Sequence, residues 1–140
     1  MKVGYYSTSG TGHCKDYPCL ALNELMTQCD VVSIHAPLNE RTMGLIGAHE
    51  LSLMKKTAFI INMGRGGIVD EKALAGAVDD GIIAGAALDV FETEPLSLES
   101  PLMKVRHPER FRFAPHTAWA STEARARLVD QIAAHVQTLS

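Results

Sequence analysis

The stretch Asp30-Val31-Val32-Ser33-Ile34-His35-Ala36-Pro37 decides the fold of this chain. It is a short apolar run rich in β-branched residues, and polar residues and a proline end it, which is typical of a buried strand. Similar runs, the last of them weaker, occur at residues 2–6, 58–62, 83–89 and 111–114. Their short length and nearly continuous apolar character favour parallel strands buried in one sheet.

Helical patterns separate most of these predicted strands and follow the last one. They cover residues 20–28, 49–54, 70–80 and 121–139. In the last pattern apolar residues recur at helical spacing, namely Leu128, Ile132, Val136 and Leu139. Ser121 is placed to cap the first turn of this helix. Alternation of strand and helix predicts an α/β fold, a doubly wound parallel sheet whose strands are joined by right-handed crossovers.

Composition narrows the class of protein. With 140 residues, 46% of them hydrophobic, the chain is one domain long and can bury a substantial core. A formal net charge of −3 gives no basic face for a phosphate backbone, so nucleic acid is not an expected partner. No apolar run approaches the span of a bilayer and no signal-peptide pattern opens the chain. We therefore expect a cytoplasmic protein without a membrane partner.

The cysteines do not indicate a structural site. Cys14, Cys19 and Cys29 are odd in number and lack a C-x-x-C spacing. This pattern argues against both a disulfide framework and a structural zinc site, so we expect reduced thiols and no bound metal.

Polar residues fall where several predicted strands end. Asn62 and Asp89 close two of the apolar runs, His35 closes another, and His116 follows the weaker run at 111–114. Ligands collect at the carboxyl ends of the strands in parallel α/β sheets, and we expect these residues to lie there, along one edge of the sheet. Glu94 adds a carboxylate that could partner His116 and favour its protonated form, which is what a proton donor needs.

Four ordered segments of the chain carry a family resemblance. They are residues 30–39, 61–70, 85–95 and 115–116. In order and spacing they resemble the D-isomer-specific 2-hydroxyacid dehydrogenases. Trp119, three residues after His116, is most similar to the glycerate dehydrogenase and hydroxypyruvate reductase branch. The resemblance implies a Rossmann-type NAD- or NADP-binding domain and hydride transfer to or from a small 2-keto or 2-hydroxy acid.

The same resemblance assigns roles to individual residues. Arg65 is implied to clamp the substrate carboxylate and carbonyl, Glu94 to partner the histidine, and His116 to donate the proton. Arginine suits a carboxylate because its planar fork can make two hydrogen bonds. The implied cofactor contacts are Ser7, Ala36, Pro37, Thr42, Met63, Gly64, Arg65, Asp89, His116 and Trp119, with Asp89 accepting from the nicotinamide carboxamide.

Each of these residues also has an ordinary structural interpretation. The glycines around Arg65 could simply serve a turn, Glu94 could be a solvated loop carboxylate, and His116 could cap the next helix. Asp89 could be a solvated strand end. The ordered motifs, taken together, favour the functional interpretation.

One departure from the family pattern concerns the glycine loop. A dinucleotide fold opens with a strand, a G-x-G-x-x-G loop and a helix, and no such arrangement is found here. We therefore expect residues 1–140 to be a partial NAD(P)-binding domain that lacks its first strand, its glycine loop and the substrate domain. Such a chain should have little activity alone. The uncovered edge of residues 2–6 should promote self-association or homo-oligomer formation.

The loop at Ser7-Thr8-Ser9-Gly10-Thr11-Gly12 leaves alternatives open. Hydroxyls and glycines after a strand resemble a flavodoxin-type phosphate loop, although a helix should then follow. In the family interpretation the loop lies beside the adenosine ribose and offers no carboxylate, while His13 and Lys15 could accept a 2′-phosphate, so NADP is as reasonable as NAD. A catalytically silent half-Rossmann module that acts by association is the remaining alternative.

Overall fold

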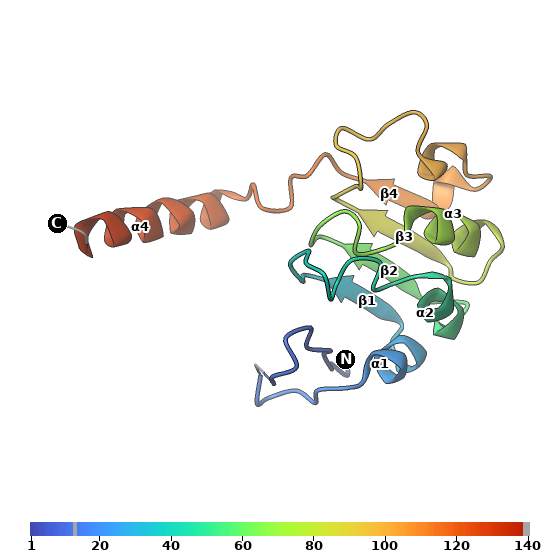
Figure 1. The fold of residues 1–140 in the computed structure, drawn as a ribbon, viewed down its shortest axis with the longest axis horizontal. Coiled ribbons are helices and arrows are strands. Elements are labelled where there is room, and N and C mark those ends of the chain that lie inside the picture. Colours follow the sequence, from blue (N-terminus) through green and yellow to red (C-terminus); the bar gives the residue numbers. More distant parts are fainter. Residues whose placement is uncertain (13, 139–140) are drawn as a thin grey trace.

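Four parallel strands form the centre of the molecule. The structure, a computed structural model, describes residues 1–12 and 14–138. The strands are β1 (Val31–Ile34), β2 (Phe59–Asn62), β3 (Gly85–Leu88) and β4 (Phe111–Phe113), and they lie in the order β1-β2-β3-β4 (Figure 1). The predicted α/β fold with a parallel sheet is confirmed.

Helices connect and cover the strands. They are α1 (Leu22–Gln28), α2 (Ala48–Leu53), α3 (Glu71–Asp79) and α4 (Thr122–Thr138), with short 3₁₀ turns η1 (Pro101–Lys104) and η2 (Pro108–Arg110) before β4. Because α2 contacts both α1 and α3, these three helices form one layer. Each of the four predicted helices begins and ends within two residues of its expected bounds.

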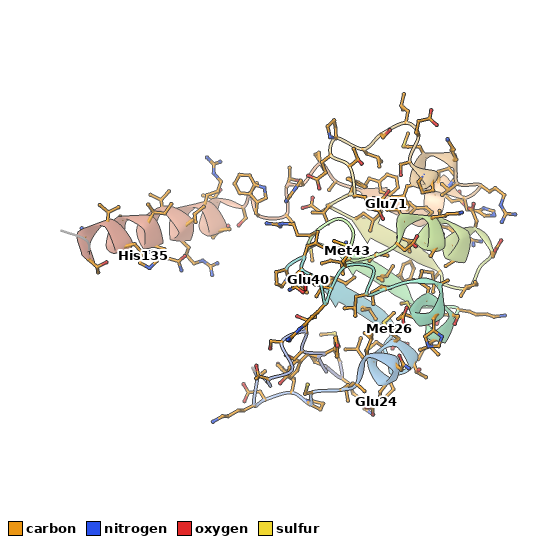
Figure 2. The ribbon with its side chains drawn as sticks, viewed as in Figure 1. Glu24, Met26, Glu40, Met43, Glu71 and His135 are labelled. Carbon is orange, nitrogen blue, oxygen red and sulfur yellow. The ribbon has the colours of Figure 1, made fainter. Side chains whose placement is uncertain are left out.

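The core lies between that layer and one face of the sheet. Its central members from the two layers are Val32, Ile34, Ile60, Met26, Leu51 and Leu74. On the other face, Val31 and Phe59 are about half exposed. Figure 2 shows Met26 on α1, the helix nearest β1. The alternation of buried and exposed residues along β1 follows from covering a single face.

The predicted strand at residues 2–6 is wrong. Only Tyr5 makes a β-bridge, to Cys19, with its N–H donating to Pro18 O at 3.0 Å and its carbonyl accepting from Leu20 N at 2.8 Å. A strand needs a continuous partner for its backbone groups, and this segment finds only a short neighbouring loop. The free edge of the sheet is therefore β1, and not residues 2–6 as expected.

Helix α4 projects away from the sheet (Figure 1). Its predicted cap is present, because Ser121 Oγ accepts from Ala124 N at 3.1 Å. The apolar residues at helical spacing are nevertheless exposed, as Leu128, Ile132 and Val136 show; Leu139, also predicted for this stripe, lies outside the described residues. Among the described residues no helix is long and apolar enough to cross a membrane.

Candidate active site

The register of the sheet brings the polar strand ends together. Ile34 pairs with Asn62, Asn62 with Leu88, and Leu88 with Phe113. The residues that follow these positions therefore lie along one edge, which places His35 and Asp89 on the same side as the loop to His116. The expectation that the polar strand ends share an edge is confirmed.

Glu94 and His116 form a direct pair. Nδ1 of His116 lies 2.7 Å from Oε2 of Glu94, and both side chains are about one-third exposed, 36% each. The other carboxylate oxygen, Oε1, accepts from Phe91 N at 3.0 Å. The hydrogen bond from His116, followed by that from Phe91 and the charge of Arg65, lowers the pKa of the Glu94 carboxyl. The carboxylate is thus kept ionised and Nε2 of His116 is left for a ligand.

A strained backbone presents His116. Its φ is +56°, in the left-handed region that costs a non-glycine residue about 1 kcal/mol or more. Asp89 holds the turn, since its two carboxylate oxygens accept from Thr117 N at 2.8 Å and Ala118 N at 2.9 Å. Trp119 adds a third tie by donating its Nε1–H to the carbonyl of His116 at 2.8 Å.

Asp89 therefore has a structural task that the sequence did not reveal. The side chain is 6% exposed, and both of its oxygens are bound to backbone N–H groups. Trp119, by contrast, is 58% exposed beyond its bond to His116. The contact expected of Asp89 with the nicotinamide, and that of Trp119 with the cofactor, stay predictions.

Asn62 shapes the loop that carries Arg65. Its Oδ1 accepts from Gly64 N at 3.0 Å and its Nδ2 donates to Arg65 O at 2.9 Å, while the side chain is buried. The guanidinium of Arg65 donates to Gly64 O at 2.8 Å and, among the described residues, is in no ion pair with a carboxylate. A cation without a carboxylate partner is suited to hold an anionic ligand.

A cleft of about 520 Å³ joins half of the predicted cofactor residues. Its lining consists of His35, Ala36, Pro37, Leu38, Met63, Gly64 and Arg65. A Cβ at Gly64 would lie 2.7 Å from Ala36 O, so only glycine leaves the two strand ends this close. The five predicted residues Ala36, Pro37, Met63, Gly64 and Arg65 are thus gathered around one hollow.

A second cavity, of about 560 Å³, runs between residues 4–9 and the free edge of β1. Ser7 lines it, and His35, Ala36 and Pro37 line both cavities. This larger cavity lies away from Glu94 and His116, which line neither hollow. Arg65 lines the smaller cleft and not the larger one, so the cationic group that could hold an anionic ligand belongs to the smaller cleft.

Thr42, also among the expected cofactor residues, does not line this cleft. It is fully buried, and its hydroxyl donates to Pro37 O at 2.7 Å and accepts from Asn39 N at 2.8 Å. The reason is that a threonine in a tight loop satisfies the loop backbone first. Thr42 therefore shapes the rim that contains Pro37, and the backbone or van der Waals contact expected of it with the cofactor stays a prediction.

The loop at residues 7–12 is not followed by a helix. In the described part of residues 13–21 no helix occurs, and α1 begins at Leu22. Ser7 Oγ donates to Thr11 O at 2.6 Å, so the loop closes on itself. The flavodoxin-type phosphate loop thus lacks the helix it requires. His13, proposed as a 2′-phosphate contact, lies outside the described residues.

Sequence reasoning missed two residues that support the site. Gly66 packs so closely on residues 91–92 that a Cβ there would overlap Phe91 O. Glu71, 6% exposed, accepts from the backbone of the loop that carries Glu94. The doublet Gly66-Gly67 was a detectable signal for a close approach, whereas an acidic residue at a helix start gave no sign of burial.

The fold and the site together define a dinucleotide-binding type of α/β domain with an acid–base pair at its edge. The chain belongs to the D-isomer specific 2-hydroxyacid dehydrogenase family, since the sequence model of that family's NAD binding domain matches residues 1–118. The expected resemblance and cofactor class are confirmed.

Relatives agree with this assignment. The chain is 46% identical to a glyoxylate reductase of Korarchaeum cryptofilum over 80% of this chain and 33% of that protein. It is 43% identical to a glycerate dehydrogenase of Methylorubrum extorquens over 83% of this chain and 37% of that protein. An acyclic imino acid reductase solved in complex with NADPH and D-Arg is 30% identical, with a TM-score of 0.82 over 99% of this chain and 44% of that one. The chain thus spans about a third of the length of the curated relatives it matches.

Proposed function

We propose that this chain carries the acid–base part of an oxidoreductase. The reaction is hydride transfer between NAD(P)H and a small 2-keto or 2-hydroxy acid of the hydroxypyruvate, glyoxylate or D-glycerate class. The observation that carries the proposal is the 2.7 Å contact of His116 with Glu94, in a site where Arg65 is not paired with a carboxylate.

Arg65 and His116 bind different groups of the substrate. The guanidinium of Arg65 binds the substrate carboxylate, because its fork matches two carboxylate oxygens. Nδ1 of His116 is committed to Glu94, so Nε2 faces the ligand and donates a proton to the carbonyl oxygen during reduction. In the reverse direction Nε2 accepts the hydroxyl proton, which requires the neutral imidazole.

The residues of the smaller cleft fit a dinucleotide. Bare backbone at Gly64 lies against Ala36, leaving a wall without a projecting side chain, and Pro37 and Met63 complete an apolar rim. These residues, together with Asp89, would hold the nicotinamide half. When bound, the cofactor supplies or accepts the hydride.

The direction of proton transfer provides the test. Rates of hydroxypyruvate reduction and D-glycerate oxidation are measured from pH 5 to 10, for this chain and for a form extended upstream by a glycine-loop segment. We expect reduction to fall and oxidation to rise as the imidazolium loses its proton, with the extended form much faster. Identical pH profiles in the two directions would exclude His116 as the proton donor and acceptor.

Cofactor preference belongs to the same proposal. The loop at Ser7 presents hydroxyls, and Lys15 follows it in the chain, with no carboxylate at the position that would bind a ribose 2′-hydroxyl. We infer that NADPH is used as well as or better than NADH. The kcat/KM ratio for the two cofactors, measured with Ser7→Asp as the contrasting variant, tests this inference. A ratio that already favours NADH several-fold before substitution would contradict it.

A catalytically silent module is the second candidate. The larger cavity along β1 and the open sheet face favour association with another polypeptide. An activity assay on the upstream-extended protein distinguishes the two candidate functions, because that protein reduces hydroxypyruvate only if the oxidoreductase proposal is right.

A further inference from the structure

Glu71 is a buried carboxylate that the proposed chemistry does not use. It is the first residue of α3, is 6% exposed, and forms no ion pair among the described residues. Its Oε1 accepts from Glu92 N at 2.8 Å, and its Oε2 accepts the hydroxyl hydrogen of Ser100 at 2.9 Å. Figure 2 shows it at the start of α3, in the part of the molecule that holds the 91–100 loop.

A carboxylate in this position needs compensation. Burying a charge without a counter-ion is unfavourable unless hydrogen bonds replace its water. Here the two donors and the N-terminal end of α3 provide it. One side chain thereby ties together two points of an otherwise exposed loop, its start at Glu92 and its end at Ser100. Ser100 in turn caps η1 by accepting from Leu102 N at 3.2 Å.

The hydrogen bond that Glu71 accepts lies next to one that Glu94 accepts. Two consecutive N–H groups donate to two different carboxylates, Phe91 N to Glu94 and Glu92 N to Glu71. On the other side Gly66 packs against the same peptide, where no Cβ could fit. The peptide between residues 91 and 92 is thus held between the start of α3 and the loop that bears Arg65.

The geometry points to Glu71 as a positioning residue. We propose that its carboxylate fixes the loop that carries Glu94, and thereby the alignment of Glu94 with Nδ1 of His116. This inference rests on the proposed function only in giving that alignment a purpose. The carboxylate of Glu71 binds Glu92 N and the Ser100 hydroxyl, while His116 pairs with Glu94, so the role of Glu71 is expressed through the loop.

The test uses nuclear magnetic resonance on this 140-residue chain and needs no catalytic turnover. The first readout is the downfield Nδ1–H resonance of His116 when it is hydrogen-bonded to Glu94. The second is the titration of the Glu94 carboxyl carbon, whose pKa the His116 bond lowers. Glu71→Ala should abolish or broaden the resonance and move the Glu94 titration upward toward that of an ordinary glutamate. Glu71→Gln should preserve both readouts, because the amide oxygen can accept from Glu92 N and the amide nitrogen can donate to Ser100 Oγ.

Glu50→Ala is the matched control. Glu50 is also a carboxylate in the first turn of a helix and accepts a backbone N–H, from Gly47 at 2.9 Å, but it lies on α2 away from the loop. It should leave both readouts unchanged. Ser100→Ala provides a milder version of the loss at Glu71, with a smaller upward movement of the Glu94 titration, and serves if Glu71→Ala does not fold.

Unchanged readouts in the folded Glu71→Ala and Ser100→Ala proteins would overturn the inference, as would equal effects of Glu50→Ala. The proposed function fails separately. If both readouts respond to Glu71→Ala while the upstream-extended protein reduces no 2-keto acid, positioning by Glu71 stands and the assigned reaction does not.

Discussion

At the scale of single residues, Asp89 links the sheet to the turn that presents His116. Its carboxylate binds the two N–H groups that follow His116, whose own backbone is held at a φ of +56°. Hydrogen bonds to a charged acceptor are stronger than those between neutral groups. Loss of this carboxylate should therefore release the turn and weaken the fold.

We expect Asp89→Ala to lower the free energy of unfolding by about 2 kcal/mol, because two N–H groups lose a charged acceptor in a nearly buried site. Urea denaturation at pH 7 measures the change. Asp16→Ala removes an exposed carboxylate and should stay within about 0.5 kcal/mol of the parent. Equal effects of the two substitutions would contradict a role for Asp89 in holding the turn.

Asp79 gives the fold a dependence on acid. The N–H of Arg106 is the main cause that lowers the pKa of its carboxyl, and the N–H of His107 adds to it. Because the folded-state pKa is below the ordinary value near 4, stability from Asp79 is fully present above about pH 4 and is lost as the pH falls through the lowered value. Glu94 behaves in the same sense.

Asp79→Asn should accordingly flatten the decline of stability below about pH 4, since the variant has no carboxylate to protonate. Urea midpoints of the parent and the variant between pH 7 and pH 2 measure this. A decline of the same steepness in both proteins would show that Asp79 does not contribute to the acid response.

At the scale of elements, α3 and α4 contrast although both carry apolar residues at helical spacing. Leu74 on α3 is fully buried between the helix layer and the sheet, whereas Ile132 on α4 is 55% exposed. We expect Leu74→Ala to cost about 2–5 kcal/mol of unfolding free energy and Ile132→Ala about 0.5 kcal/mol or less. Thermal or urea unfolding measures both; similar losses would mean that α4 packs in solution.

The elements also show how far the sequence could be taken. Apolar runs and helical spacing located β1 to β4 and the helices α1 to α4, because both patterns are local. Residues 2–6 failed as a strand, since strand formation depends on a partner that a local pattern does not contain. Likewise, no local pattern could show that the apolar stripe of α4 stays exposed.

The same distinction applies to the candidate site. Arg65, Glu94 and His116 were predicted from ordered motifs, and the structure places Glu94 against His116. Glu71 and the second task of Asp89 were missed because each depends on a loop distant in sequence folding onto a helix or strand end. The burial of Thr42 could not be predicted, because it follows from a turn that only the fold defines.

At the scale of the whole molecule, β1 is the exposed edge that invites association. The carbonyls of Asp30 and Ile34 bind β2, so the N–H and C=O groups of the alternating residues Val31, Ser33 and His35 face away from the sheet. Unpaired edges of this kind template pairing with another chain. We infer self-association through β1.

Light scattering combined with size exclusion, over a range of concentrations, tests this inference. Val31→Lys should shift the population toward monomer, because a charged side chain on an edge strand opposes pairing. Lys2→Ala alters the segment first expected to form the edge and should leave the distribution unchanged. A monomer at all concentrations, or an equal response to both substitutions, would contradict association through β1.

The projection of α4 determines where the chain is most susceptible to proteolysis. A single helix without tertiary contacts opens readily, because isolated helices of this length are marginal in water. Arg125 and Arg127 lie in it and are open to solvent. Trypsin should therefore cut the chain there first and leave the sheet with its three covering helices intact. The segment between β4 and α4 is then the boundary between the part of the chain that resists proteolysis and the part that does not.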